Sequence, residues 1–144
     1  MRSLFTIGYE GKTQAEMIGE LEAAAVALVI DVRAVAASRR PGFSKTALAA
    51  GLREHGIDYL HLCPLGTPAA GREAARKGRT GEMRAIYAEQ LETPEAALAI
   101  ERALEEASTR PSALLCYERE AADCHRSMLC EHMVERMAFA VRDL

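Results

Sequence analysis

Apolar runs that alternate with helical segments limit the folds open to this chain. Residues 27–33 (Ala-Leu-Val-Ile-Asp-Val-Arg) are continuously apolar until charge appears at the end, which is typical of an interior parallel strand. Shorter runs at residues 4–8, 57–62 and 112–117 have the same character. Strands that alternate with helices predict a parallel sheet covered on both faces. We therefore expect an α/β fold: three-layer and Rossmann-like, with a mostly parallel sheet of four to five strands.

Capping signals place the expected helices between these strands. Thr13, with Glu16 three residues later, forms a capping box. Ser44 is the expected N-cap of a helix that continues to about Glu54. Three further helices are expected, at residues 83–91, 95–107 and 124–136.

Two segments have less regular patterns. Residues 64–81 are rich in glycine and in basic side chains, which favours a long polar loop that is either functional or mobile. Residues 139–144 fit either a short fifth strand or a frayed end. The length of 144 residues suits one compact domain, residues 1–144.

Composition argues against several classes of protein. A formal net charge of −3 is not that of a polycation that coats nucleic acid. No apolar run approaches the roughly 20 residues of a transmembrane helix, and residues 1–8 turn polar too soon for a secretory signal. We therefore expect a cytoplasmic protein with no membrane partner, whose four cysteines are reduced by default, although a disulfide between Cys116 and Cys124 is conceivable as a redox switch.

The strongest functional motif spans residues 113–126. Its sequence, Ala-Leu-Leu-Cys-Tyr-Glu-Arg-Glu-Ala-Ala-Asp-Cys-His-Arg, predicts a buried strand, a polar turn and a helix start with Asp123 as N-cap. Cys124, His125 and Arg126 would then occupy the first helical turn. Unpaired backbone N–H groups and the helix dipole favour an anion or an activated thiolate there.

Polar side chains also end three of the expected strands, where open parallel sheets bind their ligands. We expect them to converge near the start of the last helix. The candidate catalytic residues are Glu10, Glu118, Cys124 and His125. The candidate anion-binding residues are Tyr9, Asp31, Arg33, Arg39, Arg40, Cys116 and Arg126.

Two of these candidates allow alternative roles. Asp31 and Arg33 alternate on a strand and so share a face, where they could simply orient each other. Alternatively, Arg33 binds a substrate anion while Asp31 anchors Arg126. In the basic turn of residues 38–44, Phe43 could stack on a base, although a place in the core is the favoured interpretation.

Several segments together resemble the domain of unknown function 488 family. They are residues 6–11, 31–33, 38–44, 65–66, 116–118 and 124–126. The resemblance follows the same order along nearly the whole chain. It implies a compact bacterial or archaeal α/β domain and assigns no reaction.

Three functions remain open at this point. The leading hypothesis is an enzyme or ligand-binding domain for a phosphorylated small molecule, a nucleotide or a nucleic-acid end. Arginines would hold the anion, and Glu10 or Glu118, then His125, would serve as general acid or base. The first alternative is a thiol-dependent redox or transfer enzyme with Cys124 as nucleophile and Cys116 resolving. The second is a non-catalytic regulatory domain.

No cofactor or metal is expected. The chain has neither a Gly-x-Gly-x-x-Gly nor a Walker loop, which argues against NAD or ATP held by the usual motifs. Cys116 and Cys124 could bind a metal with His125 or His61, but zinc sites usually show tighter paired spacing. The cysteine loop with Arg six residues after Cys is also absent. Ala-rich helices could support a homodimer.

Overall fold

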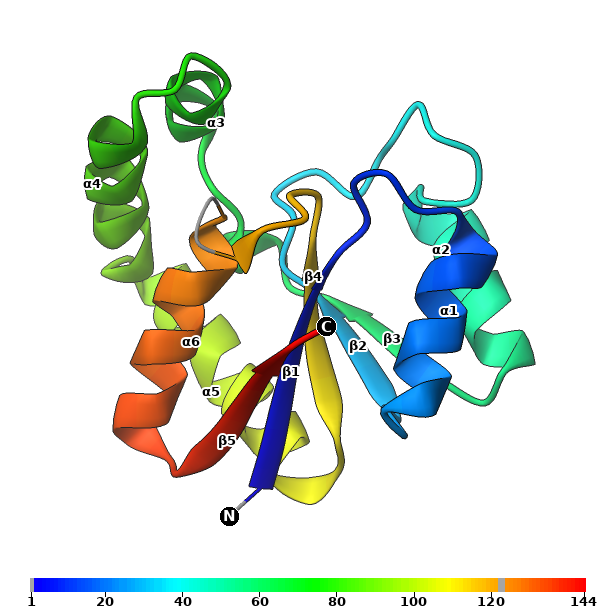
Figure 1. Cartoon of the computed structure of the whole chain (residues 1–144). Coiled ribbons are helices and arrows are strands. Elements are labelled where there is room, and N and C mark those ends of the chain that lie inside the picture. Colours follow the sequence, from blue (N-terminus) through cyan, green and yellow to red (C-terminus); the bar gives the residue numbers. More distant parts are fainter. Residues whose placement is uncertain (1, 122–123) are drawn as a thin grey trace.

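A five-stranded sheet forms the centre of the molecule, seen in a computed structural model that describes residues 2–121 and 124–144 (Figure 1). Its strands are β1 (Arg2–Gly8), β2 (Leu28–Asp31), β3 (Asp58–His61), β4 (Ser112–Cys116) and β5 (Phe139–Asp143). Every pair of neighbouring strands is parallel. The expected three-layer α/β class is therefore confirmed, and the end of the chain forms a strand rather than a frayed tail.

Helices cover both faces of this sheet. They are α1 (Gln14–Ala23), α2 (Lys45–Glu54), α3 (Ala69–Arg76), α4 (Thr80–Leu91), α5 (Pro94–Thr109) and α6 (His125–Arg136), together with a 3-10 turn, η1 (Cys63–Leu65). Helices α1 and α2 lie on one side of the sheet, and α3 to α6 lie on the other (Figure 1). Among the described residues, no helix is both long and apolar enough to cross a membrane.

The core has two halves because consecutive strand residues point to opposite faces. In β4, Leu114 packs with the cluster of α4, α5 and α6, and Leu115 packs with that of α1 and α2. All five residues of β4 are buried. This strand is central and is covered on both faces, which explains its continuously apolar sequence.

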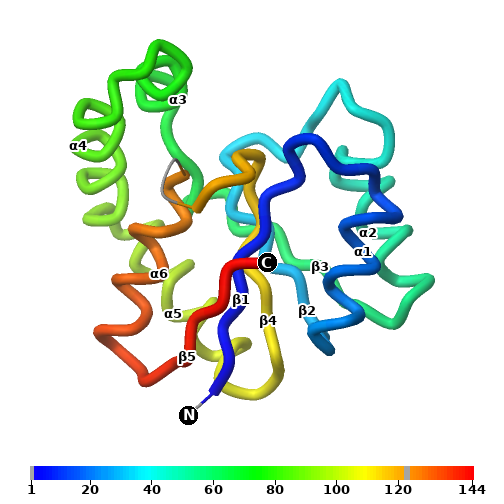
Figure 2. The backbone as a smooth tube through the Cα atoms, viewed as in Figure 1, coloured from blue at the N-terminus to red at the C-terminus, as the bar shows by residue number. Residues whose placement is uncertain are grey.

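The strand order is β3-β2-β4-β1-β5. It differs from the Rossmann order, in which the first strand follows the second directly. The chain leaves β1 and β2 toward the α1–α2 face, whereas it leaves β4, which lies between them, toward α6 (Figure 2). The connections therefore diverge at the carboxyl ends of these three strands, where α/β proteins form ligand crevices.

The prediction of a loop at residues 64–81 is wrong, because this segment contains α3, the end of η1 and the start of α4. Helix α3 (Ala-Ala-Gly-Arg-Glu-Ala-Ala-Arg) buries only the small residues Gly71 and Ala74. Its sequence therefore lacks the large apolar side chains at helical spacing that would predict a helix. Packing against α4 and the cluster beneath it stabilises α3 instead.

Helix starts agree only in part with their predicted caps. The capping box of Thr13 and Glu16 is present. Ser44 stands at the N-cap of α2, but its hydroxyl is hydrogen bonded to the backbone of Ser38. The expected cap Asp123 lies outside the described residues. The N-cap of α6 is Cys124, so the helix begins one residue later than predicted.

Candidate functional site

A cavity of about 690 Å³ lies at the carboxyl ends of β1, β2 and β4, beside α3 and the start of α4. Of the predicted site residues, it brings together Tyr9, Glu10, Arg33, Cys116, Glu118 and His125. Asp31, Arg39, Arg40, Cys124 and Arg126 do not line it. The convergence of strand ends thus occurs, but several cations expected at the ligand lie elsewhere.

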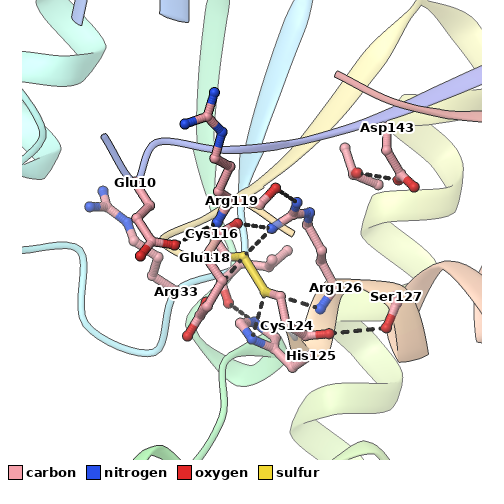
Figure 3. The surroundings of a disulfide bond; sticks show 12 residues. Glu10, Arg33, Cys116, Glu118, Arg119, Cys124, His125, Arg126, Ser127 and Asp143 are labelled. Carbon is pink, nitrogen blue, oxygen red and sulfur yellow. Dashed lines mark hydrogen bonds between the residues drawn. A yellow bond between two sulfur atoms is a disulfide. The ribbon is translucent and has the colours of Figure 1, made fainter. Parts of the chain in front are cut away.

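Cys116 and Cys124 form a disulfide at this cavity (Figure 3). Cys116 ends β4 and Cys124 caps α6, and both side chains are almost completely buried. The expectation of four reduced cysteines is therefore wrong for this pair, because the sulfurs at the end of β4 and at the start of α6 meet. Cys63 and Cys130 are free thiols.

His125 is held in one tautomer beside the disulfide. Its Nε2 lies 2.7 Å from the carbonyl oxygen of Val32, which can only accept, so Nε2 carries the proton. The lone pair of Nδ1 then faces Cys124 Sγ, 3.5 Å away. Burial lowers the pKa of His125 to about 4, so the ring is neutral near pH 7.

Arg126 is fully buried and directs its guanidinium at a sulfur rather than at the cavity. Nη1 donates to Cys116 Sγ at 2.8 Å and to the carbonyl oxygen of Glu118, and Nη2 donates to that of Arg119 (Figure 3). Burial lowers the pKa of Arg126, but a guanidinium stays protonated in proteins. A fixed positive charge therefore stands beside Cys116.

Asp31 and Arg33 pair with each other. Nη2 of Arg33 lies 2.7 Å from Oδ2 of Asp31, and Nε contacts the same carboxylate. The alternative in which Asp31 anchors Arg126 is therefore wrong, since Arg33, two residues beyond the end of β2, takes this carboxylate instead. Arg33 also donates to the Phe43 carbonyl oxygen and to the Tyr9 hydroxyl.

The basic turn at residues 38–44 serves mainly to hold the structure together. Phe43 is buried and stacks on Tyr9 with ring centroids 4.5 Å apart, as its favoured place in the core predicts. Arg40 donates to the carbonyl oxygens of Tyr9 and Lys12. Arg39 is exposed.

The two candidate acids lie on the cavity wall near the β4–α6 connection. Glu10 accepts a hydrogen bond from the Arg119 backbone N–H at 3.0 Å. Glu118 Oε2 lies 3.5 Å from Cys116 Sγ. The backbone of Glu118 packs directly against Gly8. Only glycine fits there, because a Cβ on residue 8 would come within 1.7 Å of the Glu118 carbonyl oxygen.

Sequence reasoning did not include Arg72 and Arg76 of α3, which also line the cavity. They are four residues apart and so share one face of the helix. The basic character of their segment was a signal, but recognising them required the helix that the sequence did not predict.

A family model described as "Domain of unknown function DUF488" matches residues 13–133. The matched segment contains β2, β4 and most of α6, and therefore both cysteines of the disulfide. No curated protein and no solved structure matches the chain.

Proposed function

The chain belongs to the DUF488 family, and we propose that it is a thiol–disulfide oxidoreductase whose redox-active pair is Cys116 and Cys124. One observation carries this proposal: cysteines eight residues apart meet as a disulfide at a cavity, beside a buried arginine. At about 690 Å³ the cavity is of the size that takes small-molecule ligands.

Arg126 and the start of α6 favour the reduced, ionised form of the pair, and they act against the Glu118 carboxylate, whose Oε2 lies 3.5 Å from Cys116 Sγ. The thiolate is the reactive species, and a neighbouring guanidinium stabilises it. Arg126 supplies that charge to Cys116. Cys124 at the N-cap of α6 accepts the Arg126 backbone N–H at 3.5 Å, so the helix start favours its negative charge as well. The His125 Nδ1 lone pair can accept the Cys124 S–H while that thiol is protonated.

The exchange begins at Cys116, because this residue lines the cavity whereas Cys124 does not. The Cys116 thiolate attacks one sulfur of a substrate disulfide, so a mixed disulfide forms and the second substrate sulfur leaves as a thiolate. Cys124, as thiolate, then attacks the Cys116 sulfur and displaces the first substrate sulfur. The protein dithiol is oxidised, the substrate disulfide is reduced, and the two cysteine protons pass to the released thiolates. The roles of the cysteines are thus the reverse of those expected from the sequence.

A second candidate function rests on the cations of the cavity wall. Arg33, Arg72 and Arg76 all line it, and this supports binding of a phosphorylated small molecule, a nucleotide or a nucleic-acid end. The first candidate is the better supported, because the buried charge of Arg126 is directed at a sulfur.

Trapping of the mixed disulfide tests the proposal. Reduced Cys124→Ser protein is mixed with glutathione disulfide and analysed by peptide mass spectrometry, with Cys63→Ser, which removes an exposed thiol, as control. We expect glutathione to accumulate on Cys116 in Cys124→Ser, and the Cys63→Ser protein to recover the internal disulfide. If folded Cys124→Ser carries no adduct on Cys116, the proposed function is wrong.

The second candidate is tested separately by calorimetric titration of nucleoside phosphates into wild type and Arg76→Ala. Affinity that falls at least tenfold in the variant would support it. Absence of binding to wild type would remove it.

A further inference from the structure

Three ligand atoms of soft-metal type meet at the disulfide. The Sγ atoms of Cys116 and Cys124 and the Nδ1 atom of His125 all lie within 4.8 Å of one another (Figure 3). We propose that the reduced protein binds a thiophilic divalent cation, of which Zn²⁺ is the representative, through these three atoms. The inference rests on one part of the proposed function, namely that the two cysteines can be reduced.

His125 is already prepared as a ligand. A histidine that binds a metal through one ring nitrogen usually donates the other N–H to a carbonyl or carboxylate, which fixes the tautomer and the ring orientation. The Val32 carbonyl oxygen does this at 2.7 Å from Nε2. Tyr87 packs edge-on against the same ring at 5.0 Å between centroids, which further restricts its rotation.

One of the three ligand–ligand distances already fits a tetrahedral ion, and the other two need the Cys116 sulfur to move after reduction. Zn–S bonds of about 2.3 Å and Zn–N bonds of about 2.05 Å give an S···N edge of about 3.5 Å and an S···S edge of about 3.8 Å. The observed distance from Cys124 Sγ to His125 Nδ1 is 3.5 Å. Reduction breaks the bond between the sulfurs and lets them separate to non-bonded contact. That separation is close to the S···S distance of about 3.8 Å expected around zinc.

The charges balance in a reduced site once the Glu118 carboxylate, whose Oε2 lies 3.5 Å from Cys116 Sγ, is counted against the Arg126 guanidinium. Two thiolates neutralise a divalent cation, and the Arg126 guanidinium can remain as a hydrogen-bond donor to the Cys116 sulfur. Cys116 and His125 both line the cavity, so the fourth position of the ion would face it. Three protein ligands with one open position are typical of a site that accepts an exogenous ligand rather than a purely structural one.

Redox state would control this site. Disulfide formation removes both thiolate ligands at once, so only the dithiol form binds the ion. Conversely, a bound ion protects the dithiol from oxidation, since its thiolates are no longer free to attack a disulfide.

Co²⁺ is a suitable probe because tetrahedral thiolate coordination gives it visible d–d bands and a sulfur-to-metal charge-transfer band. Reduced protein is freed of metal with a chelator and titrated with Co²⁺, after which Zn²⁺ is added in competition. The variants are Cys124→Ser, His125→Gln and, as matched control, Cys63→Ser; folding of each is checked by circular dichroism.

We expect both bands to saturate at one equivalent in reduced wild type and Cys63→Ser, to disappear on addition of Zn²⁺ and to be absent from the oxidised protein. Affinity should fall at least tenfold in folded Cys124→Ser or His125→Gln. If reduced wild type, with both thiols confirmed by alkylation, gives no thiolate–cobalt band, the inference is wrong and the redox proposal stands. If Co²⁺ binds but no glutathione adduct forms on Cys116, the metal site stands and the redox proposal fails.

Discussion

Replacing Arg126 with methionine removes the guanidinium beside Cys116 but keeps an unbranched side chain in the same buried space. The structure gives this guanidinium one bond to the Cys116 sulfur, with Nη1 at 2.8 Å. A hydrogen bond to a charged group contributes about 1.5–3 kcal/mol. In the reduced protein this free energy favours the thiolate, whereas the disulfide has no charge to stabilise.

The reduction potential should therefore fall in Arg126→Met, because the reduced form loses stabilisation. About 1.4 kcal/mol corresponds to 30 mV for a two-electron couple, so we expect a shift of roughly 30–60 mV toward more negative values. The full shift should appear above pH ~8.5, where an unperturbed thiol is already ionised. It should shrink as the pH falls, since protonation of the thiolate removes the interaction.

Equilibration in glutathione buffers at pH 9 and pH 7, followed by acid quenching, alkylation and mass spectrometry, measures this potential. Arg136→Met is the matched control, because Arg136 lies on the same helix but is exposed and pairs with Glu101. A potential in folded Arg126→Met within about 10 mV of that of wild type at pH 9 would refute the reasoning, since one charged hydrogen bond predicts at least ~30 mV.

Gly8→Ala should lower the free energy of unfolding by about 1–3 kcal/mol, measured in urea, because its Cβ would meet the Glu118 carbonyl oxygen at 1.7 Å; unchanged stability would contradict the close approach. His125 is neutral when folded, with its pKa lowered to about 4, but ionises near 6.5 when unfolded. The free energy of unfolding of wild type should therefore fall by roughly 3 kcal/mol between pH 6.5 and pH 4, and this part of the fall should be missing in His125→Gln. Asp31→Asn should cost about 3–5 kcal/mol, because it leaves the buried Arg33 without its counter-charge; a loss below ~1 kcal/mol would show that the pair contributes little.

The fold class was predictable because the inner strands β2 and β4, and most of β1, are buried on both faces. Continuous apolar runs such as residues 27–33 are typical of parallel strands. The polar residues at their ends indicate where a site lies. The strand order was not predictable, since no local pattern states that β4 lies between β1 and β2. Helix α3 was also missed, because its buried face consists of the small residues Gly71 and Ala74 and contains no large apolar side chain.

The candidate site was predictable in its residue types and less so in its pairings. Cys116, Glu118 and His125 do meet at the cavity. The direction of Arg126 could not be read from sequence, because a cation at a helix start can face either a ligand or the loop before it. Here the backbone carbonyl oxygens of Glu118 and Arg119 accept hydrogen bonds from its guanidinium. Likewise, spacing alone left open whether Asp31 would pair with Arg33 or Arg126.

The central position of β4 has a consequence for the order in which the protein can assemble. β1 and β2 both pair with β4 and not with each other. A nascent chain that ends before residue 112 can therefore form the β2–α2–β3 unit but leaves the inner edges of β1 and β2 unpaired. Such long-range pairing slows folding and exposes strand edges to other chains. Because Cys116 arrives on that same strand, the two sulfurs should come together only after β4 has joined β1 and β2, although β5 is still to be added.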